Sequence, residues 1–537
     1  MNDIARQLGE AGLPAPVAEL AARDWDAIIV GGGHNGLTAA AYLARAGRSV
    51  LVLERRERLG GAATLERPFA DERYVVSPCA YVVGLLDELV ISELDLRSRG
   101  LRYWVADPNL WVPFEDGTAF GQWLDDARTE ANLRELGVSD RDVAGYWAYE
   151  ELFDEARRRL RKGERDTWVG DAPTRPEIEE LLGSEEMIDL VFEASIAEVL
   201  DAHLTDERLK TALFGQGIIG TWGGPYEKGT ASIKLMHYQG DLDGQGPVWG
   251  YVEGGMGMCS FAIADAAAEA GATLACGVPV ARIVPDEGVV LEDGTALRAS
   301  TVICNADPKR LLAMLDGAEV DAAFRDRLEA WKVRSPVVKF NAALERLPTW
   351  TAAPGEAWPA RATIDATGTM AEAQAAFDAC ERGEPAVAFG EIYIQTGHDP
   401  SPAPEGRHLM SVFGQYAPYD IAGSDWDAAR DGVARQFIDL ISRFAPDFEH
   451  CLIDHEVLGP PDIESRIGLT GGNIFQGEVT PDQMWEGRLA ARTPVTGLYL
   501  CGAATHPAGS VIALNGRNAA AAVLADQGAG LAVAASA

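Results

Sequence analysis

The chain has 537 residues, of which 82 are acidic and 46 basic, so its formal net charge is −36. An acidic balance of this size repels phosphate backbones and anionic lipid headgroups, so we expect no nucleic-acid partner. The longest apolar runs, such as residues 519–524, are far shorter than a bilayer, so we expect no transmembrane segment. The length is enough for two domains with sizeable cores.

Residues 1–23 mix charged with apolar side chains and lack the apolar stretch of a signal peptide. We predict a short helical extension that packs on the protein surface, with contact to a membrane surface as the alternative. Seven scattered cysteines without a CxxC pair favour the reducing cytoplasm and exclude thiol–disulfide reductase chemistry. His450 and His455 flank Cys451 and Asp454, but we interpret this group as a loop and predict no metal site.

Residues 26–54 contain, in order, the parts that a dinucleotide site requires. We expect a buried strand, a GxGxxG turn, a helix of small residues and a second strand, at 27–30, 31–36, 37–46 and 49–53. Gly31 permits the tight turn, Gly33 lets the backbone approach a pyrophosphate, and Gly36 lets the helix lie close on the strand. Glu54 ends the second strand 23 residues after Gly31, where a carboxylate accepts hydrogen bonds from an adenosine ribose.

Two further segments favour FAD over NAD. A basic stretch that closes on a glycine pair follows Glu54 and would lie near the diphosphate; its residues include Arg55, Arg56, Gly60, Gly61 and Ala62. Far along the chain we expect a strand at 498–501, a turn at Gly502 and an alanine-rich helix from about Ile512. The N-terminus of that helix would face the flavin end of FAD. The alternative is a buried strand and helix that hold no ligand.

The chain resembles the FAD-dependent phytoene dehydrogenase and carotenoid oxidoreductase superfamily, whose wider fold group includes the flavin amine oxidases. The resemblance covers most of residues 24–526 and is carried, beyond the two ends, by residues 251–274, 302–312 and 468–478. These blocks are most similar to the branch that holds pyridine nucleotide-disulfide oxidoreductase domain-containing protein 2 and the monocomponent carotenoid ketolases. Two positions depart from the pattern: Ala62 stands where many relatives have Arg, and Ala508, Gly509 and Ser510 stand where they have three glycines.

We therefore expect an α/β protein in which a Rossmann-like FAD-binding domain of the glutathione reductase and amine oxidase type is interleaved with an α+β substrate domain. The expected segments are the extension 1–23, FAD-binding segments 24–111, 251–334 and 465–537, and substrate segments 112–250 and 335–464. The resemblance implies that the backbone of Val280 holds the adenine. The complete set of expected FAD-binding residues is Gly31, Gly33, Asn35, Gly36, Glu54, Arg55, Arg56, Gly60, Gly61, Ala62, Val280, Gly502, Ala503 and Val511.

A second GxGxxG match, at Gly215, Gly217 and Gly220, follows a helical stretch and has no helix directly after it. We therefore do not interpret it as a nucleotide site. Without a second dinucleotide turn, we expect oxygen or a quinone, not NAD(P)+, to accept the electrons.

The sequence indicates the catalytic residues less clearly than the cofactor site. In a flavoenzyme the flavin accepts the hydride and the protein mainly orients the C–H bond, so no particular catalytic motif is required. The candidates for catalysis are His506 and Glu478, with Asn515 and Arg517 as weaker ones; capping or ion pairing is the alternative role for the last three. Four side chains are candidates for an apolar substrate pocket, with ordinary core packing as the alternative: Trp222, Tyr226, His237 and Tyr238.

These observations predict a cytoplasmic FAD-dependent oxidoreductase of the dehydrogenase or desaturase type, acting on CH–CH or allylic C–H bonds of a hydrophobic substrate. An isoprenoid or carotenoid is the candidate class. Two alternatives on the same fold are a flavin amine oxidase and a lipid-binding, chaperone-like protein without cofactor. The intact glycine turn and Glu54 argue against the second.

Overall fold

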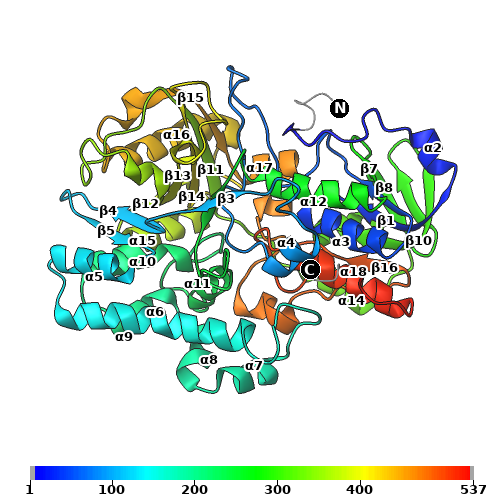
Figure 1. Cartoon of the computed structure of the whole chain (residues 1–537), viewed down its shortest axis with the longest axis horizontal. Coiled ribbons are helices and arrows are strands. Elements are labelled where there is room, and N and C mark those ends of the chain that lie inside the picture. Colours follow the sequence, from blue (N-terminus) through cyan, green and yellow to red (C-terminus); the bar gives the residue numbers. More distant parts are fainter. Residues whose placement is uncertain (1–6, 533–537) are drawn as a thin grey trace.

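The computed structural model describes residues 7–532. Two seven-stranded sheets lie beside one another, and a lobe of helices lies below the second sheet (Figure 1). The predicted N-terminal extension falls partly on residues 1–6, which lie outside the described part. Its described part contains the short helix α2 (Val17–Ala21), whose Leu20 is buried and accepts a hydrogen bond from the indole of Trp25.

The first sheet is built from segments that lie far apart in the sequence. Its strand order is β7-β2-β1-β10-β9-β8, and β16 pairs with β10. The strands β2, β7, β10 and β16 run parallel to their neighbours around β1, whereas β8, β9 and β10 form an antiparallel extension. The bounds are β1 Asp24–Val30, β2 Val50–Leu53, β7 Thr273–Ala275, β8 Val280–Val284, β9 Gly288–Leu291, β10 Ala296–Cys304 and β16 Leu498–Leu500.

The central strand β1 is apolar at successive positions because both faces of this sheet are covered. Ile29 packs with the helices α3 (His34–Arg45), α12 (Gly257–Glu269) and α18 (Leu514–Asp526). Ile28 packs on the other side with the helices α13 (Pro308–Met314) and α14 (Ala322–Ala330). The glycine-turn segment is therefore held rigidly between two hydrophobic cores.

The second sheet has the strand order β15-β11-β14-β13-β12-β4-β5 and is antiparallel except for the contact between β12 and β4. Its outer face is apolar and packs on α16 (Trp426–Ser442). Its strands are β4 Leu110–Pro113, β5 Ala119–Gln122, β11 Val337–Leu344, β12 Thr363–Thr367, β13 Phe389–Tyr393, β14 His408–Gln415 and β15 Leu452–Leu458. β4 begins two residues before the domain boundary that the sequence predicts at residue 112.

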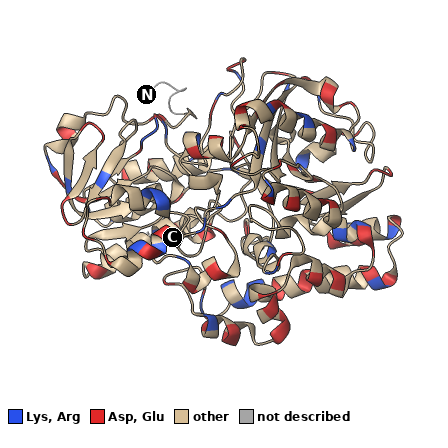
Figure 2. Ribbon diagram, turned by 180° about the vertical axis from the view of Figure 1, so that it is seen from behind, with Lys and Arg blue, Asp and Glu red and all other residues tan. Residues whose placement is uncertain are grey.

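A two-stranded ribbon, β3 (Tyr103–Val105) with β6 (Gly250–Val252), lies where the chain leaves and re-enters the first domain. Between these strands the chain forms most of the helical lobe, and Figure 2 shows many Lys, Arg, Asp and Glu positions along its helices at the lower edge. The lobe consists of α5 Asp126–Glu135, α6 Asp140–Arg161, α7 Arg175–Leu182, α8 Glu185–Phe192, α9 Ile196–His203, α10 Glu207–Leu213 and α11 Ala231–His237. The remaining helices are α4 Glu88–Glu93, α15 Met370–Glu381 and α17 Pro460–Ile467.

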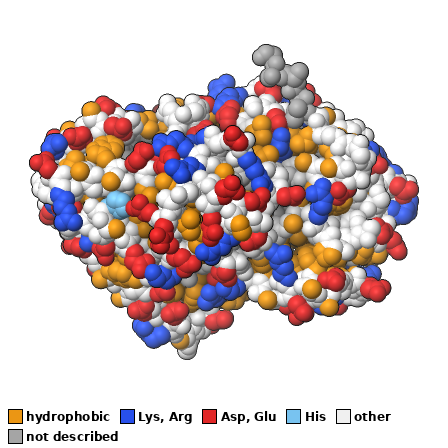
Figure 3. Space-filling view, turned by 90° about the horizontal axis from the view of Figure 1, so that it is seen from below, with side chains coloured by type: hydrophobic (Ala, Val, Ile, Leu, Met, Phe, Trp, Pro, Cys, Tyr) orange, Lys and Arg blue, Asp and Glu red, His pale blue; other side chains and the backbone are white. Residues whose placement is uncertain are grey.

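The predicted fold class is confirmed: a Rossmann-like α/β unit is combined with a second sheet and helices. Within residues 7–532 no helix is long and apolar enough to cross a membrane. Acidic and basic side chains are mixed over the face seen in Figure 3, and hydrophobic ones are scattered among them.

Candidate functional site

A cavity of about 490 Å³ runs from the glycine turn of the first sheet to the inner face of the second sheet. It begins where β1 and β2 end, at Val30 and Leu53. Ligands of open α/β sheets bind outside the carboxyl ends of the strands, so this is the position that the topology favours.

The glycine turn exposes backbone to the cavity. Gly33 precedes α3 as its N-cap and no side chain caps the helix, so the first-turn N–H groups remain open to an anion. A Cβ atom on Gly36 would lie 2.3 Å from the carbonyl oxygen of Gly31, which confirms that the helix approaches the strand too closely for any side chain. The Asn305 amide donates to that same carbonyl at 3.1 Å and holds the turn from the end of β10.

Glu54 lies at the cavity wall at the end of β2 and is 6% exposed. Its carboxylate accepts hydrogen bonds from the backbone N–H of Gly32 at 2.8 Å and of Arg56 at 2.9 Å. Burial raises its pKa, and these two backbone donors oppose the rise. Each carboxylate oxygen retains a lone pair, which is what two ribose hydroxyl donors require.

These residues fit FAD. The bare glycine backbone and the uncapped helix suit a diphosphate, and Glu54 suits a ribose. The cavity is lined by eleven of the expected FAD-binding residues: Gly31, Gly33, Asn35, Glu54, Arg55, Gly60, Gly61, Ala62, Val280, Ala503 and Val511. Gly36, Arg56 and Gly502 lie behind this wall. Arg56 pairs with Glu66 and donates to the carbonyl of Gly61 at 3.3 Å, so it supports the wall and does not line it.

The loops at the flavin end are joined by a buried arginine that the sequence reasoning missed. Arg488 is 2% exposed and donates to the carbonyl oxygens of Phe475 at 2.6 Å and Ala503 at 2.7 Å, both on residues that line the cavity. It also donates to the carbonyl of Glu478 at 2.9 Å. No carboxylate among the described residues pairs with it, so its role here is to fix two loop segments, 475–478 and the one at Ala503, by their backbone.

Neither side chain predicted for catalysis lines the cavity. Glu478 is buried and forms an ion pair with Arg334 at 2.6 Å. His506 is buried, and its Nε2 lies 2.6 Å from the carbonyl of Thr167. Asn515 donates to the carbonyl of Thr505 at 2.9 Å, and Arg517 pairs with Glu93. The catalytic roles stay predictions, and the structure shows bracing contacts for all four side chains.

One of the four predicted pocket residues lines the cavity. His237 is buried at the wall beside Trp249 and Phe475, and burial lowers its pKa to about 4, so it is neutral. Trp222 instead lines a separate groove, and Tyr226 is 48% exposed. The Tyr238 hydroxyl bonds to Glu150 within the helical lobe.

The inner face of the second sheet contributes polar side chains that the sequence reasoning did not single out. Lys339, Glu391, Tyr393 and Phe413 line the cavity from β11, β13 and β14. The sequence feature that could have identified them is a polar residue at alternate positions of an otherwise apolar strand, as in the sequence VVKFNAAL of β11. Lys339 is 1% exposed, and its Nζ lies 4.1 Å from the ring centroid of Phe413.

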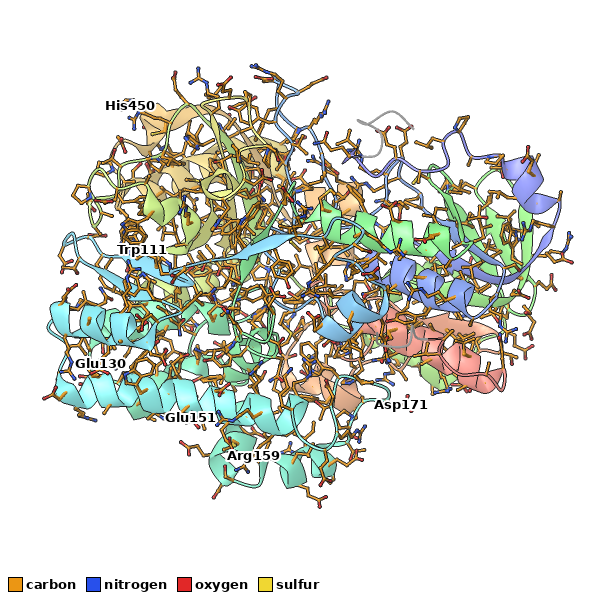
Figure 4. The ribbon with its side chains drawn as sticks, in the orientation of Figure 1. Trp111, Glu130, Glu151, Arg159, Asp171 and His450 are labelled. Atoms are coloured by element: carbon orange, nitrogen blue, oxygen red, sulfur yellow. The ribbon has the colours of Figure 1, made fainter. Side chains whose placement is uncertain are left out.

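Neither the group around His450 nor the second GxGxxG match forms a binding site among the described residues. His450 lies at the outer edge of the second-sheet domain (Figure 4) and does not line the cavity. Residues 7–532 contain no cluster of His, Cys, Asp or Glu that could hold a metal. The second GxGxxG match forms a 3₁₀ turn (Gly215–Gly217) after α10, with no strand before it.

Comparison with known proteins agrees with this geometry. Residues 29–83 match the NAD(P)-binding Rossmann-like domain, and residues 144–524 match the model of the flavin containing amine oxidoreductases. The chain belongs to the flavin containing amine oxidoreductase family. It is therefore an FAD-dependent oxidoreductase, and the predicted cofactor and enzyme class are confirmed.

Relatives within this family cover nearly the whole chain. Pyridine nucleotide-disulfide oxidoreductase domain-containing protein 2 of Mus musculus is 32% identical over 94% of both chains. Hydroxyneurosporene desaturase of Cereibacter sphaeroides is 27% identical over 93% of this chain and 97% of its own. These relatives confirm the resemblance to the carotenoid oxidoreductases. Among solved structures, putrescine oxidase shares the fold, with a TM-score of 0.58 at 17% identity over 94% of this chain and 99% of its own.

Proposed function

We propose that the protein catalyses FAD-dependent dehydrogenation at CH–CH or allylic C–H bonds of a hydrophobic substrate, with isoprenoids as the expected class. The observation that carries the proposal is the apolar wall of the cavity beyond the glycine turn. That wall is formed by Val82, Leu85, Ile219, Trp249, Phe413, Ile474 and Phe475. A pocket of this composition favours a hydrocarbon surface over a small charged molecule.

The relatives support the same reaction class. The desaturase reported above is a full-length relative by sequence, whereas putrescine oxidase matches only as a fold. We therefore base the proposed reaction class on the relatives found by sequence and not on the neighbours found by structure.

The residues of this chain have defined tasks in that reaction. When bound, FAD supplies the hydride acceptor. The glycine turn and Glu54 would hold its diphosphate and ribose, Arg488 braces the loops of Phe475 and Ala503, and the apolar wall would orient the substrate and exclude water. Dehydrogenation to an alkene needs no nucleophile from the protein, and none of the seven cysteines is exposed.

We further propose that oxygen or a quinone reoxidises the flavin. Among the described residues the only GxGxxG turn between a strand and a helix is the one that begins at Gly31, because the GxGxxG match at Gly215 lacks both flanking elements. A cytoplasmic location belongs to the same proposal, and it is supported by seven buried, unpaired cysteines.

The proposal is tested by anaerobic mixing of FAD-loaded protein with a panel of hydrophobic isoprenoids and a matched panel of amines, followed by flavin absorbance. We expect bleaching of the oxidised flavin band with isoprenoids and none with amines. Bleaching by amines alone would favour the amine oxidase alternative. If the protein could not be loaded with FAD, that result would contradict its assignment as an FAD-dependent enzyme.

A further inference from the structure

Four side chains form one row across the inner face of the second sheet. Lys339 on β11 lies opposite Phe413 on β14, Phe413 lies opposite Glu391 on β13, and Glu391 lies opposite Asp365 on β12. Directly opposed residues of antiparallel strands point to the same face and have neighbouring side chains. The row therefore places the carboxyl group of Glu391, which lines the cavity, beside that of Asp365, and it places a lysine on the other side of a phenylalanine ring.

Asp365 is the deeper of the two acids and is neutral. It is 1% exposed, and its Oδ1 has no hydrogen-bond partner. Its Oδ2 lies beside the backbone of Gly215, 3.0 Å from the position that a Cβ would take there. No Lys or Arg in the described chain lies within 4 Å of its carboxyl group. An ionised carboxylate in this position would be buried without compensation, so the group holds its proton.

Glu391 lines the cavity and has the partners of an anion. It is 4% exposed, accepts a hydrogen bond from the Gln216 amide at 3.0 Å and accepts another from the Tyr393 hydroxyl. Two donors leave lone pairs free on both oxygens. Burial raises the pKa of Glu391, and the hydrogen bonds from Tyr393 and Gln216 and the charge of Lys339 oppose the rise. With Asp365 protonated beside it, we infer that the pair carries a single negative charge.

Lys339 balances that charge. Burial lowers its pKa to about 8, so it is mostly protonated at neutral pH. It lies over the rings of Phe413 and Tyr81, with its Nζ 4.1 and 4.9 Å from their centroids. The other charged side chains of the cavity wall lie at the dinucleotide end: Glu54, Arg55, Glu292 and Arg310. At the substrate end, one cation and one anion leave no net charge.

We propose that Glu391, with the neutral Asp365 behind it, binds a hydroxyl group of an otherwise apolar substrate. This rests on the proposed function and narrows its substrate class to hydrophobic alcohols. An ammonium group would leave the buried substrate end with an uncompensated positive charge, and a carboxylate would face the anion of Glu391. A pure hydrocarbon would leave the free lone pairs of Glu391 without a donor. A hydroxyl satisfies them without adding charge.

The first test compares three probes of one carbon skeleton: geraniol, geranylamine and the hydrocarbon myrcene. Their binding to FAD-loaded protein at pH 7 is measured by calorimetry and by the change in flavin absorbance. We expect geraniol to bind about tenfold more tightly than either other probe, the size of one hydrogen bond to a charged acceptor. The inference is overturned if geraniol has no advantage over myrcene, including no binding at all, or if geranylamine binds best.

Variants then test whether Glu391 causes the preference for geraniol. Glu391→Gln removes the charge and should abolish most of the geraniol advantage. Asp365→Asn replaces a neutral acid with a neutral amide and should retain the advantage, as should Glu381→Gln, an exposed position on α15. An unchanged advantage in Glu391→Gln, or equal loss in Asp365→Asn, contradicts the assignment.

A measurement without any substrate probe tests the protonation of Asp365. The infrared spectrum of the FAD-loaded protein at pH 7 should contain the carbonyl band of a buried protonated carboxyl group, and Asp365→Asn should remove it. Its absence overturns the inference. Flavin reduction by the probes reports separately on the proposed function: tight binding of geraniol without reduction would contradict dehydrogenation of that alcohol and leave the binding site for its hydroxyl intact.

Discussion

The carboxylate of Glu54 accepts a 2.8 Å hydrogen bond from the backbone N–H of Gly32, which joins the end of β2 to the glycine turn. Glu54→Ala should weaken FAD binding by roughly 1.5–3 kcal/mol, because ribose hydroxyls lose a charged acceptor. Gly33→Val should be worse and leave the site empty, since a Cβ there would lie 3.0 Å from the Asn305 amide and within the phosphate path. Fluorescence titration of apoprotein with FAD measures both, with the exposed Glu57→Ala as control. Equal FAD affinity in all variants would mean that the phosphate turn is misassigned.

Arg488→Met should lower the free energy of unfolding by at least about 3 kcal/mol, because several buried carbonyl groups lose their donor together. It should also loosen the loops of Phe475 and Ala503 and increase loss of FAD at a temperature where the protein remains folded. Urea unfolding and FAD release check this against Arg141→Met, an exposed position on α6. A variant as stable as the parent would show that these loops do not depend on the arginine.

Lys339→Met should stabilise the protein at pH 7, although it removes the positive charge opposite Glu391, because the cost of burying the ammonium outweighs its attraction to Glu391. Burial lowers the Lys339 pKa from 10.5 to about 8, so between these values the unfolded chain binds the proton and the folded protein does not. The wild-type free energy of unfolding therefore rises as pH increases from 8 to 10.5, and at pH 7 the buried charge costs up to about 3 kcal/mol. The gain in Lys339→Met over wild type should shrink across this window. Urea unfolding at pH 7 and pH 10 measures it, with the exposed Lys228→Met as control.

The protein should lose stability as pH falls from 6.5 to 4. Burial lowers the pKa of His34, His237 and His506 from 6.5 to about 4, so in this window the unfolded chain takes up protons that the folded protein excludes. Each histidine contributes a loss of up to about 3 kcal/mol. Thermal unfolding against pH should show a shallower acid slope in His506→Gln, and His450→Gln, at an exposed position, should keep the parental slope.

Photoreduced enzyme should be reoxidised faster by oxygen or a quinone than by NAD(P)+. Enzymes that pass hydride between flavin and nicotinamide commonly hold the second dinucleotide on its own glycine-rich turn, and the described chain has one GxGxxG turn between a strand and a helix. Stopped-flow absorbance measures the rates. If NAD(P)+ outpaces oxygen and every quinone tested, a nicotinamide site exists on another element.

The predicted nucleotide end of the molecule rests on a local pattern. The turn from Gly31 to Gly36, the strand before it and the acid at Glu54 lie within one continuous segment, so their spacing alone specifies a shape that binds a diphosphate and a ribose. In the second domain the sequence also predicts strands at 337–344 and 386–394, and β11 has the first of these ranges as its bounds. Strand ends were less certain: β13 is shorter than the predicted 386–394, since pairing with β12 and β14 covers only Phe389–Tyr393.

The substrate end depends on tertiary structure, for a physical reason. Lys339, Glu391 and Asp365 are distant in sequence, and only the register of β11, β14, β13 and β12 places them in one row. The local sequence does not decide whether aromatic residues near a glycine-rich stretch line a pocket or pack in the core. In the folded chain His237 lies at the cavity and Tyr226 is exposed. A contiguous motif binds through its own backbone, whereas a pocket wall is made by whichever side chains the packed sheets bring together.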